Sequence, residues 1–277
     1  MPVFKRSTLK TTSRREKNFR ANGAVAKLNL NYRVFENFVD DAFFPDAASR
    51  LFPRSSLMQI FNRTTQLPQR EKSERFRRFD RERLEAHLAV AQYGPFRLTE
   101  AIRPSFDLAI IPEEGWRFDR YVDPESGAGV PVAIAAVSRE KLFDVFLALF
   151  DGVGTTVDVV VESSHRQNGT RDSSTREGVD APVLKSVFCD YEDVLLNDGC
   201  LGVAVLDAEQ PLEIQFDEHK LLSVYGDDLS DAVATFRQFR IPRKPTLRFL
   251  NEAEHIHASR QSFYRAFDAL KFDLGAE

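Results

Sequence analysis

The chain contains little cysteine and no long apolar run, and both absences exclude classes of protein. Only Cys189 and Cys200 occur among the 277 residues. Two cysteines are too few for a disulfide framework, and their spacing matches no paired zinc-ligand pattern, so we expect both thiols to be reduced and packed. No stretch approaches the roughly 20 consecutive apolar residues of a membrane-spanning helix, and residues 1–17 lack the apolar core of a secretory signal. A cytoplasmic location without a membrane span is therefore expected.

Sequence motifs that carry catalysis are missing as well. The chain has no GxxxxGK[ST] phosphate loop, no GxSxG nucleophile elbow and no set of kinase signatures. Gly152 and Gly154 resemble the start of a dinucleotide fingerprint, but they follow a predicted helix and precede a predicted strand, whereas phosphate binding needs the opposite order. We therefore predict no catalytic residue and no cofactor, and favour a non-enzymatic protein. An active site assembled from residues scattered in the sequence stays open.

The charges are distributed unevenly along a chain of ordinary globular composition, 43% hydrophobic and 29% charged. The net charge is only −4, from 38 Lys and Arg against 42 Asp and Glu. Residues 1–83 hold 19 basic and 9 acidic side chains, which leaves 19 basic and 33 acidic side chains for residues 84–277. A basic leader before an acidic body indicates either an anionic partner, such as nucleic acid or a membrane surface, or a leader that folds back on its own domain.

The first third of the chain is predicted to be an extension of the body. Residues 1–31 have little periodic apolar content, so they bury too little surface to offset the entropy of ordering. Short apolar clusters interrupted by Pro45 and Pro53 then favour short helices, and the charged residues 69–93 favour a solvated helix. We predict a basic, helical or partly disordered extension over residues 1–94.

The acidic body, residues 95–277, begins with alternating strand and helix patterns. Residues 130–137 form a nearly continuous apolar run, which is typical of a strand covered on both faces. Ser138 supplies a helix N-cap, a helix is expected over 139–151, and residues 156–161 favour the next strand. Strand, helix and strand in this order predict a right-handed βαβ unit whose two strands are parallel.

The remainder of the body completes the predicted fold class. We expect a polar loop over 163–181, a helix with one apolar face over 182–198, and two short antiparallel strands within 212–225. A helix over 228–240 and mostly one terminal helix over 247–272 follow. The predicted class is α/β, or α+β: a mixed sheet with at least one parallel βαβ unit, a C-terminal antiparallel meander and flanking helices.

Polar side chains follow both strands of the predicted βαβ unit. The carboxyl ends of parallel strands lie at one edge of a sheet, where α/β proteins usually bind ligands. Backbone amides at the start of the helix after Ser138 would favour an anion there. The alternative is an ordinary cap followed by solvated loop residues. The candidate ligand-binding residues are Ser138, Arg139, Ser163, Ser164, His165 and Arg166.

Histidine is scarce, with five residues in the chain. His255 and His257 suggest a metal site at first sight. On a helix, residues i and i+2 point about 200° apart and could not share one ion, whereas on a strand they would lie on one face. The flanking residues favour a helix and the HExxH spacing is absent, so we predict no metal site. Asp217, Glu218 and His219 share a predicted turn, where acidic side chains often stabilise the turn itself.

The leading hypothesis is a cytosolic, non-enzymatic binding or assembly protein whose basic, aromatic-bearing arm docks on a protein partner or another subunit. The helix predicted over 139–151 has almost no polar face, so it must be covered by other parts of the chain or by a second subunit. One alternative is an enzyme or small-anion binder at the crevice of the strand ends. Another is nucleic-acid association through the arm and the basic residues within 75–83. The arm residues are Arg14, Arg15, Lys17, Arg20, Phe35 and Phe38.

Overall fold

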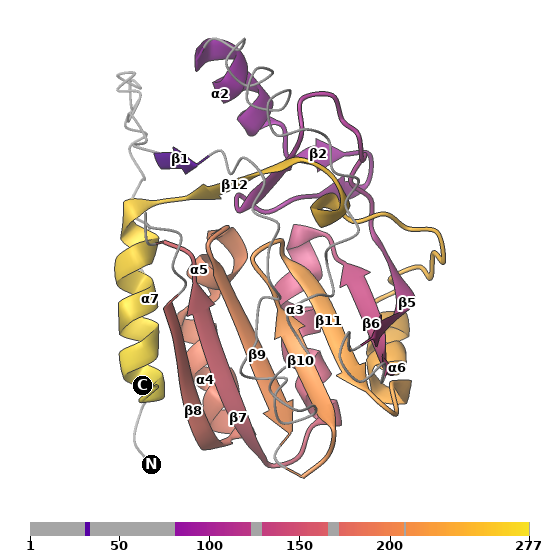
Figure 1. Cartoon of the computed structure of the whole chain (residues 1–277), viewed down its shortest axis with the longest axis vertical. Helices are drawn as coiled ribbons and strands as arrows, with labels where there is room; N and C mark the ends of the chain where they lie inside the picture. The colour runs from indigo at the N-terminus through magenta and orange to yellow at the C-terminus, as the bar shows by residue number, and fades with distance from the viewer. Residues whose placement is uncertain (1–30, 34–80, 123–128, 166–171, 208, 277) are drawn as a thin grey trace, which may run out of the picture.

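The computed structural model describes residues 31–33, 81–122, 129–165, 172–207 and 209–276. Its main feature is a seven-stranded sheet with helices packed on one face, and a smaller sheet lies across one end of the strands (Figure 1). The arm residues named above and Arg166 lie outside the described residues, so the predictions about the arm and the extension stay predictions. Within the described part, no helix is both long enough and apolar enough to cross a membrane.

The main sheet is antiparallel throughout. All six pairs of neighbouring strands run in opposite directions. In spatial order the strands are β5 (Gly115–Val122), β6 (Gly129–Ala136), β11 (Leu221–Gly226), β10 (Leu212–Phe216), β9 (Leu201–Asp207), β7 (Thr156–Ser163) and β8 (Asp172–Asp180).

The prediction of an α/β fold with a parallel βαβ unit is therefore wrong. The two strands of that predicted unit, β6 and β7, do run in the same direction and are joined by helix α3 (Arg139–Leu149), but β11, β10 and β9 lie between them. Three strands from later in the chain thus fill the gap that the crossover spans. The apolar run of β6 fits this position because Ala133 and Ala135 face the helices while Val132 and Ile134 pack in a cluster on the other face.

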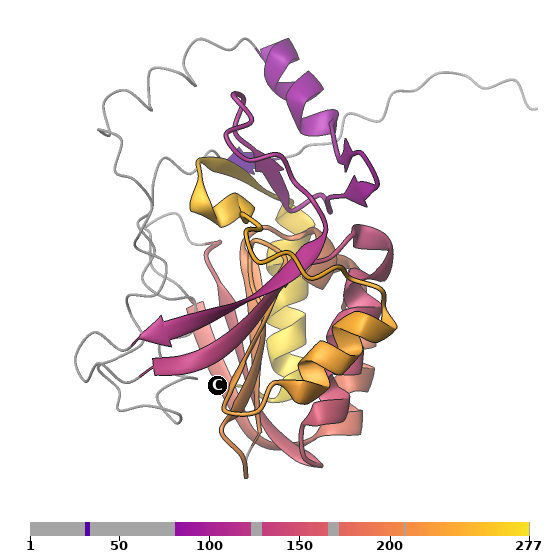
Figure 2. The ribbon, with the colours of Figure 1, turned by 90° about the vertical axis from the view of Figure 1, so that its right-hand side faces the viewer.

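Among the described residues, helices cover only one face of the main sheet, as the side view shows (Figure 2). They are α3, α4 (Ala181–Asp190), α5 (Glu192–Asn197), α6 (Ser230–Gln238) and α7 (Gln261–Leu274). Their apolar side chains form one core with the alternate residues of the strands. Phe146 of α3 is fully buried in that core, between the rings of Phe150, Phe188 and Phe216. The apolar helix predicted from the sequence is thus covered within its own chain.

Two further predictions of local structure are wrong. The expected polar loop over 163–181 contains β8, a largely polar edge strand. The expected terminal helix is preceded by a one-turn 3-10 helix, Leu250–Glu252, and by strand β12 (His255–Ser259), so helix α7 begins only at Gln261. Helix-forming residues in β12 adopt a strand because tertiary pairing outweighs the small differences in local propensity.

The smaller sheet consists of β1 (Asn31–Arg33), β12 and β4 (Ile102–Pro104), all antiparallel. Helix α2 (Arg81–Ala89) and a short hairpin of β2 (Gln92–Tyr93) and β3 (Phe96–Arg97) lie between β1 and β4 in the sequence. Strand β12 crosses the edge of the main sheet at which β6, β7 and β10 end (Figure 1). Segments far apart in the sequence therefore meet at this edge.

The first testable prediction concerns Phe146. Replacing this buried ring with alanine would leave a cavity among the neighbouring phenylalanine rings, so Phe146→Ala should lower the free energy of unfolding by about 3–5 kcal/mol. Phe272 on α7 is 85% exposed, and Phe272→Ala is the matched control with little expected change. Urea unfolding of both variants measures the difference. Equal stabilities would contradict the position of α3 in the core.

A second prediction uses Glu213 of β10, which is fully buried on the face opposite the helices. Burial raises the pKa of its carboxyl group from 4.5 to about 7. Between those values the folded protein binds more protons than the unfolded chain, so the stability conferred by this group falls as the pH rises through the window. The neutral isostere Glu213→Gln should be nearly neutral at pH 4 and stabilising at pH 8, by an amount on the order of 1–3 kcal/mol. Urea unfolding at both pH values tests this, and parallel pH profiles for the two proteins would refute it.

Candidate metal centre

Two elements place three imidazoles at the crowded edge of the sheet. The first is the turn between β10 and β11, which holds His219. Asp217 closes this turn, because its Oδ1 accepts a hydrogen bond of 2.8 Å from the backbone N–H of Leu221. Lys220 has a φ of 61°, a left-handed conformation that lets the chain reverse within a few residues. Local turn geometry thus fixes the backbone that carries His219.

The second element is β12, which supplies His255 and His257. Successive side chains of a strand point to opposite faces, so these two residues share one face. Ile256, between them, is fully buried on the other side. The prediction of a helix here is wrong, so the argument that the two imidazoles point apart does not hold.

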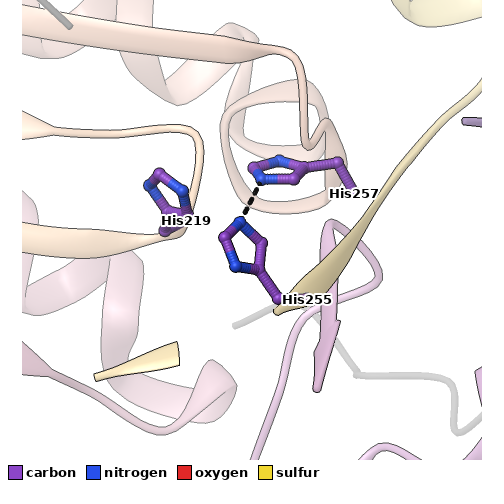
Figure 3. Close-up of side chains that lie close together, drawn as sticks. All are labelled: His219, His255 and His257. Carbon is purple, nitrogen blue, oxygen red and sulfur yellow. Dashed lines mark hydrogen bonds between the residues drawn. The ribbon is translucent and has the colours of Figure 1, made fainter. Parts of the chain in front are cut away.

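The three rings form a nearly equilateral cluster (Figure 3). The distances between ring centroids are 4.9 Å from His219 to His255, 4.9 Å from His219 to His257, and 4.8 Å from His255 to His257. One nitrogen of each ring lies within 4.8 Å of a nitrogen of each of the others. Between His255 and His257 the two Nε2 atoms are 2.8 Å apart.

Acceptor oxygens determine which nitrogen of each ring carries the proton. Nδ1 of His255 lies 2.7 Å from the carbonyl oxygen of Ala253, and Nδ1 of His257 lies 2.6 Å from that of Gly199. Nδ1 of His219 lies 3.1 Å from Oδ2 of Asp217. Carbonyl and carboxylate oxygens only accept, so each Nδ1 donates and each neutral ring keeps its lone pair on Nε2.

Two lone pairs that face each other at 2.8 Å repel unless a cation lies between them. A proton is a poor candidate for that cation. Burial above all, and then the neighbouring His219, lower the pKa of His255 to about 3. Burial and the two neighbouring imidazoles hold the pKa of His257 well below its ordinary value. Both rings are therefore neutral at pH 7, which is the form that binds metal ions.

A tetrahedral ion fits the pair of His255 and His257 after a small shift. Zinc–nitrogen bonds of about 2.0–2.1 Å at tetrahedral angles separate two ligating nitrogens by about 3.3 Å, so the two Nε2 atoms need to move apart by about half an ångström. Backbone carbonyls and a carboxylate behind the ligands are the usual outer-shell partners of metal-bound histidines. All five histidines and both cysteines lie in the described part of the chain, and no fourth one joins this cluster. The fourth coordination position is thus left to water, an oxygen ligand or a substrate.

A second group, His165, Asp198 and Cys200, also brings potential ligand atoms within 4.8 Å of one another. Its surroundings fit a metal ion poorly. The ammonium group of Lys220 is buried beside Asp198 and Cys200, where burial lowers its pKa to about 8 while those acidic groups raise it. A divalent cation at this position would face that ammonium group at close range. The same ammonium group also acts on His257, so the three-histidine cluster is favoured by its three imidazole ligands rather than by charge balance.

The second group does not form a serine-type active site either. His165 contacts the hydroxyl of Ser163 through Nδ1 and the carboxylate of Asp198 through Nε2, the connectivity of a catalytic triad. Ser163, however, is only 1% exposed, and its Oγ also accepts a hydrogen bond from the backbone N–H of His165. A nucleophile in that position would be out of reach of a substrate.

None of the other residues nominated from the sequence is a member of the cluster. Ser138 stands at the N-terminus of α3, but its hydroxyl donates to Glu140 and its backbone N–H donates to Glu114. Two carboxylates of the chain thus lie where an anion was expected. Arg139 is half-buried on the first turn of α3, and Ser164 contacts Glu218 over 3.3 Å. Cys189 is exposed rather than packed, whereas Cys200 is buried.

The cluster was not predicted from the sequence, because the residues around His255 were expected to form a helix rather than a strand. The spacing of His255 and His257 was visible, and a strand over these residues would have aligned them. His219 lies 36 residues earlier in the sequence, and only the tertiary structure brings it to the pair.

A scan of protein-family models, a search of the curated proteins and a search of the solved structures found no match to this chain. Its function is therefore inferred from the chemistry of its own site.

One backbone position holds β12 against the main sheet. Gly199, just before β9, donates a hydrogen bond of 2.8 Å to the carbonyl of Ala258 and accepts one of 2.6 Å from His257. A Cβ atom on Gly199 would lie 2.3 Å from the carbonyl oxygen of Ala101 and 2.9 Å from that of Ala258. Only glycine fits this contact without a backbone shift.

We therefore expect Gly199→Ala to destabilise the protein by about 1–3 kcal/mol, the usual cost of overpacking. The matched control is Gly154→Ala, since a Cβ on Gly154 would meet its nearest atom, a carboxylate oxygen of Asp207, at 3.5 Å, an ordinary contact. Thermal and urea unfolding of both variants give the comparison. If Gly199→Ala were as stable as Gly154→Ala, the close approach of β12 would be incorrect.

Proposed function

We propose that this protein binds a divalent transition metal ion of the zinc type through His219, His255 and His257, and that it functions with that ion. The observation that carries the proposal is the 2.8 Å approach of two Nε2 atoms whose rings both donate through Nδ1 to backbone carbonyls. Imidazole ligands suit zinc, copper, iron and nickel, whereas magnesium and calcium prefer oxygen.

The ligand set favours a reactive ion over a structural one. Structural zinc sites are closed by four protein ligands, usually including thiolates, whereas catalytic sites use three protein ligands and keep one position for water or substrate. Three neutral nitrogens leave the full positive charge of the ion to act on that position. A zinc ion so held lowers the pKa of its bound water to about 7 and polarises carbonyl or phosphoryl oxygens. Hydrolysis or hydration is the reaction class that this site supports best.

Asp217 contributes to this chemistry through His219. A carboxylate behind a metal-bound imidazole fixes the orientation of the ring and raises its basicity as a ligand. Both effects strengthen the binding of the ion without adding a negatively charged ligand.

The hypotheses drawn from the sequence are still predictions. A binding or assembly role and nucleic-acid association both depend on the basic arm, whose candidate residues lie outside the described part of the chain. A cytoplasmic location is likewise still a prediction. None of these is incompatible with a metal centre in the body.

The test is metal binding by protein freed of metal with a chelator. We expect one Zn²⁺ or Co²⁺ per chain by mass spectrometric metal analysis and calorimetry, and a stabilisation of about 2.7 kcal/mol when free metal is 100 times its dissociation constant. His219→Gln, His255→Gln and His257→Gln should each weaken binding beyond the about 10–100-fold cost that is typical of outer-shell changes. Chelator-sensitive hydrolysis of an activated ester or phosphate ester then tests the reaction class.

The matched control is His87→Gln. His87 bonds to the carbonyl of Pro104 and is not a member of the cluster, so its replacement should leave metal binding unchanged. The metal centre would be refuted if the wild-type protein bound neither Zn²⁺ nor Co²⁺. It would also be refuted if His87→Gln weakened metal binding as much as the replacements of the cluster histidines do.

A further inference from the structure

We infer that His165 and Asp198 are positioning residues for the metal centre: together they hold strand β12 and the Gly199 carbonyl in the places that orient His257. This inference rests on the proposed metal site. It gives a role to His165, which the sequence nominated for a different reason, without making it a ligand.

His165 joins three elements that surround the cluster. It follows β7 directly, and its Nδ1 contacts the hydroxyl of Ser163 at the end of that strand. Its Nε2 lies 3.1 Å from the hydroxyl of Ser259, the last residue of β12, and 2.8 Å from Oδ2 of Asp198 in the segment before β9. The side chains of His165 and Asp198 are 8% and 0% exposed, so both contacts are shielded from water.

Asp198 in turn shapes the peptide that orients His257. Its Oδ1 accepts a hydrogen bond of 3.0 Å from the backbone N–H of Cys200, which wraps the chain around Gly199. The carbonyl of Cys200 accepts a further bond of 2.9 Å from the N–H of Ser164. The Gly199 peptide between these anchors then bonds to β12 through both its N–H and its carbonyl.

His165 is therefore connected to the metal site through two short series of contacts. One branch passes through Ser259 to the strand that carries two of the three ligands. The other passes through Asp198 to the carbonyl that receives the Nδ1 proton of His257. Loss of either branch would let the imidazole of His257 turn, and outer-shell changes of this kind cost about 10–100-fold in metal affinity.

The experiment titrates Co²⁺ into metal-free wild type, His165→Gln, Asp198→Asn and Ser259→Ala. Asparagine keeps an oxygen for the Cys200 N–H but removes the charge, and Ser259→Ala removes only the branch to β12. Lys185→Ala, on the helical face in an ion pair with Asp151, is the matched surface control. The readouts are the dissociation constant, the visible absorption bands of bound Co²⁺, and the melting temperature of the metal-free proteins.

We expect His165→Gln and Asp198→Asn to raise the dissociation constant about 10–100-fold, with Ser259→Ala showing a smaller increase, and to change the Co²⁺ bands, because the geometry around the ion changes. Lys185→Ala should behave like wild type. A purely structural role would lower the melting temperature of the metal-free protein and leave the affinity and the bands of the folded protein unchanged.

Three results would overturn the inference. Wild-type affinity and bands in Ser259→Ala and Asp198→Asn would do so even if His165→Gln failed to fold. Two ions per wild-type chain, with the second lost in His165→Gln and Asp198→Asn, would make His165 a ligand instead. Wild-type protein without metal binding would remove the proposed function and this inference together, whereas the first two results leave the three-histidine centre intact.

Discussion

The contact between Gly199 and strand β12 is the constraint on which the edge of the sheet with the candidate site depends. The Gly199 peptide donates to Ala258 and accepts from His257, so a single residue both joins the small sheet to the main one and sets the tautomer of an imidazole. A side chain of any size at this position would collide with the backbone of Ala101. Backbone packing and the orientation of a candidate metal ligand are thus coupled at one peptide.

The antiparallel order of the main sheet explains why polar and potential ligand side chains gather at this edge. Strands β6, β7 and β10 all end here, and a polar residue follows within two positions of each end. The turn after β10 contributes His219 and the buried Lys220, and the segment after β7 contributes His165. Strand β12 contributes His255 and His257. The ammonium group of Lys220 lies among the carboxylates of Asp198, Asp217 and Glu218, and its charge also acts on His257. The two neighbouring groups differ in their ligand types, with three imidazoles in one and an imidazole, a carboxylate and a thiol in the other.

Periodicity predicted the local elements of the body well and their arrangement poorly. The apolar run of β6, the apolar helix α3 and the amphipathic helix α6 are confirmed close to their expected limits. The parallel pairing of β6 with β7 is wrong, because adjacency in a sheet depends on strands that come later in the chain. Strand β8 was missed because an edge strand that faces water has a polar sequence, and β12 because helix-forming residues were paired into a sheet.

The sequence by itself determined the inventory and the local geometry: five histidines, two cysteines, the apolar strands, and turns that reverse the chain at set places. The tertiary structure alone decided which strands became neighbours, which residues around His255 became a strand, and that His219 would meet His255 and His257. The physical reason is one of range. Propensity and periodicity act over a few residues, whereas strand order and the convergence of ligands depend on contacts between segments that are distant in the chain.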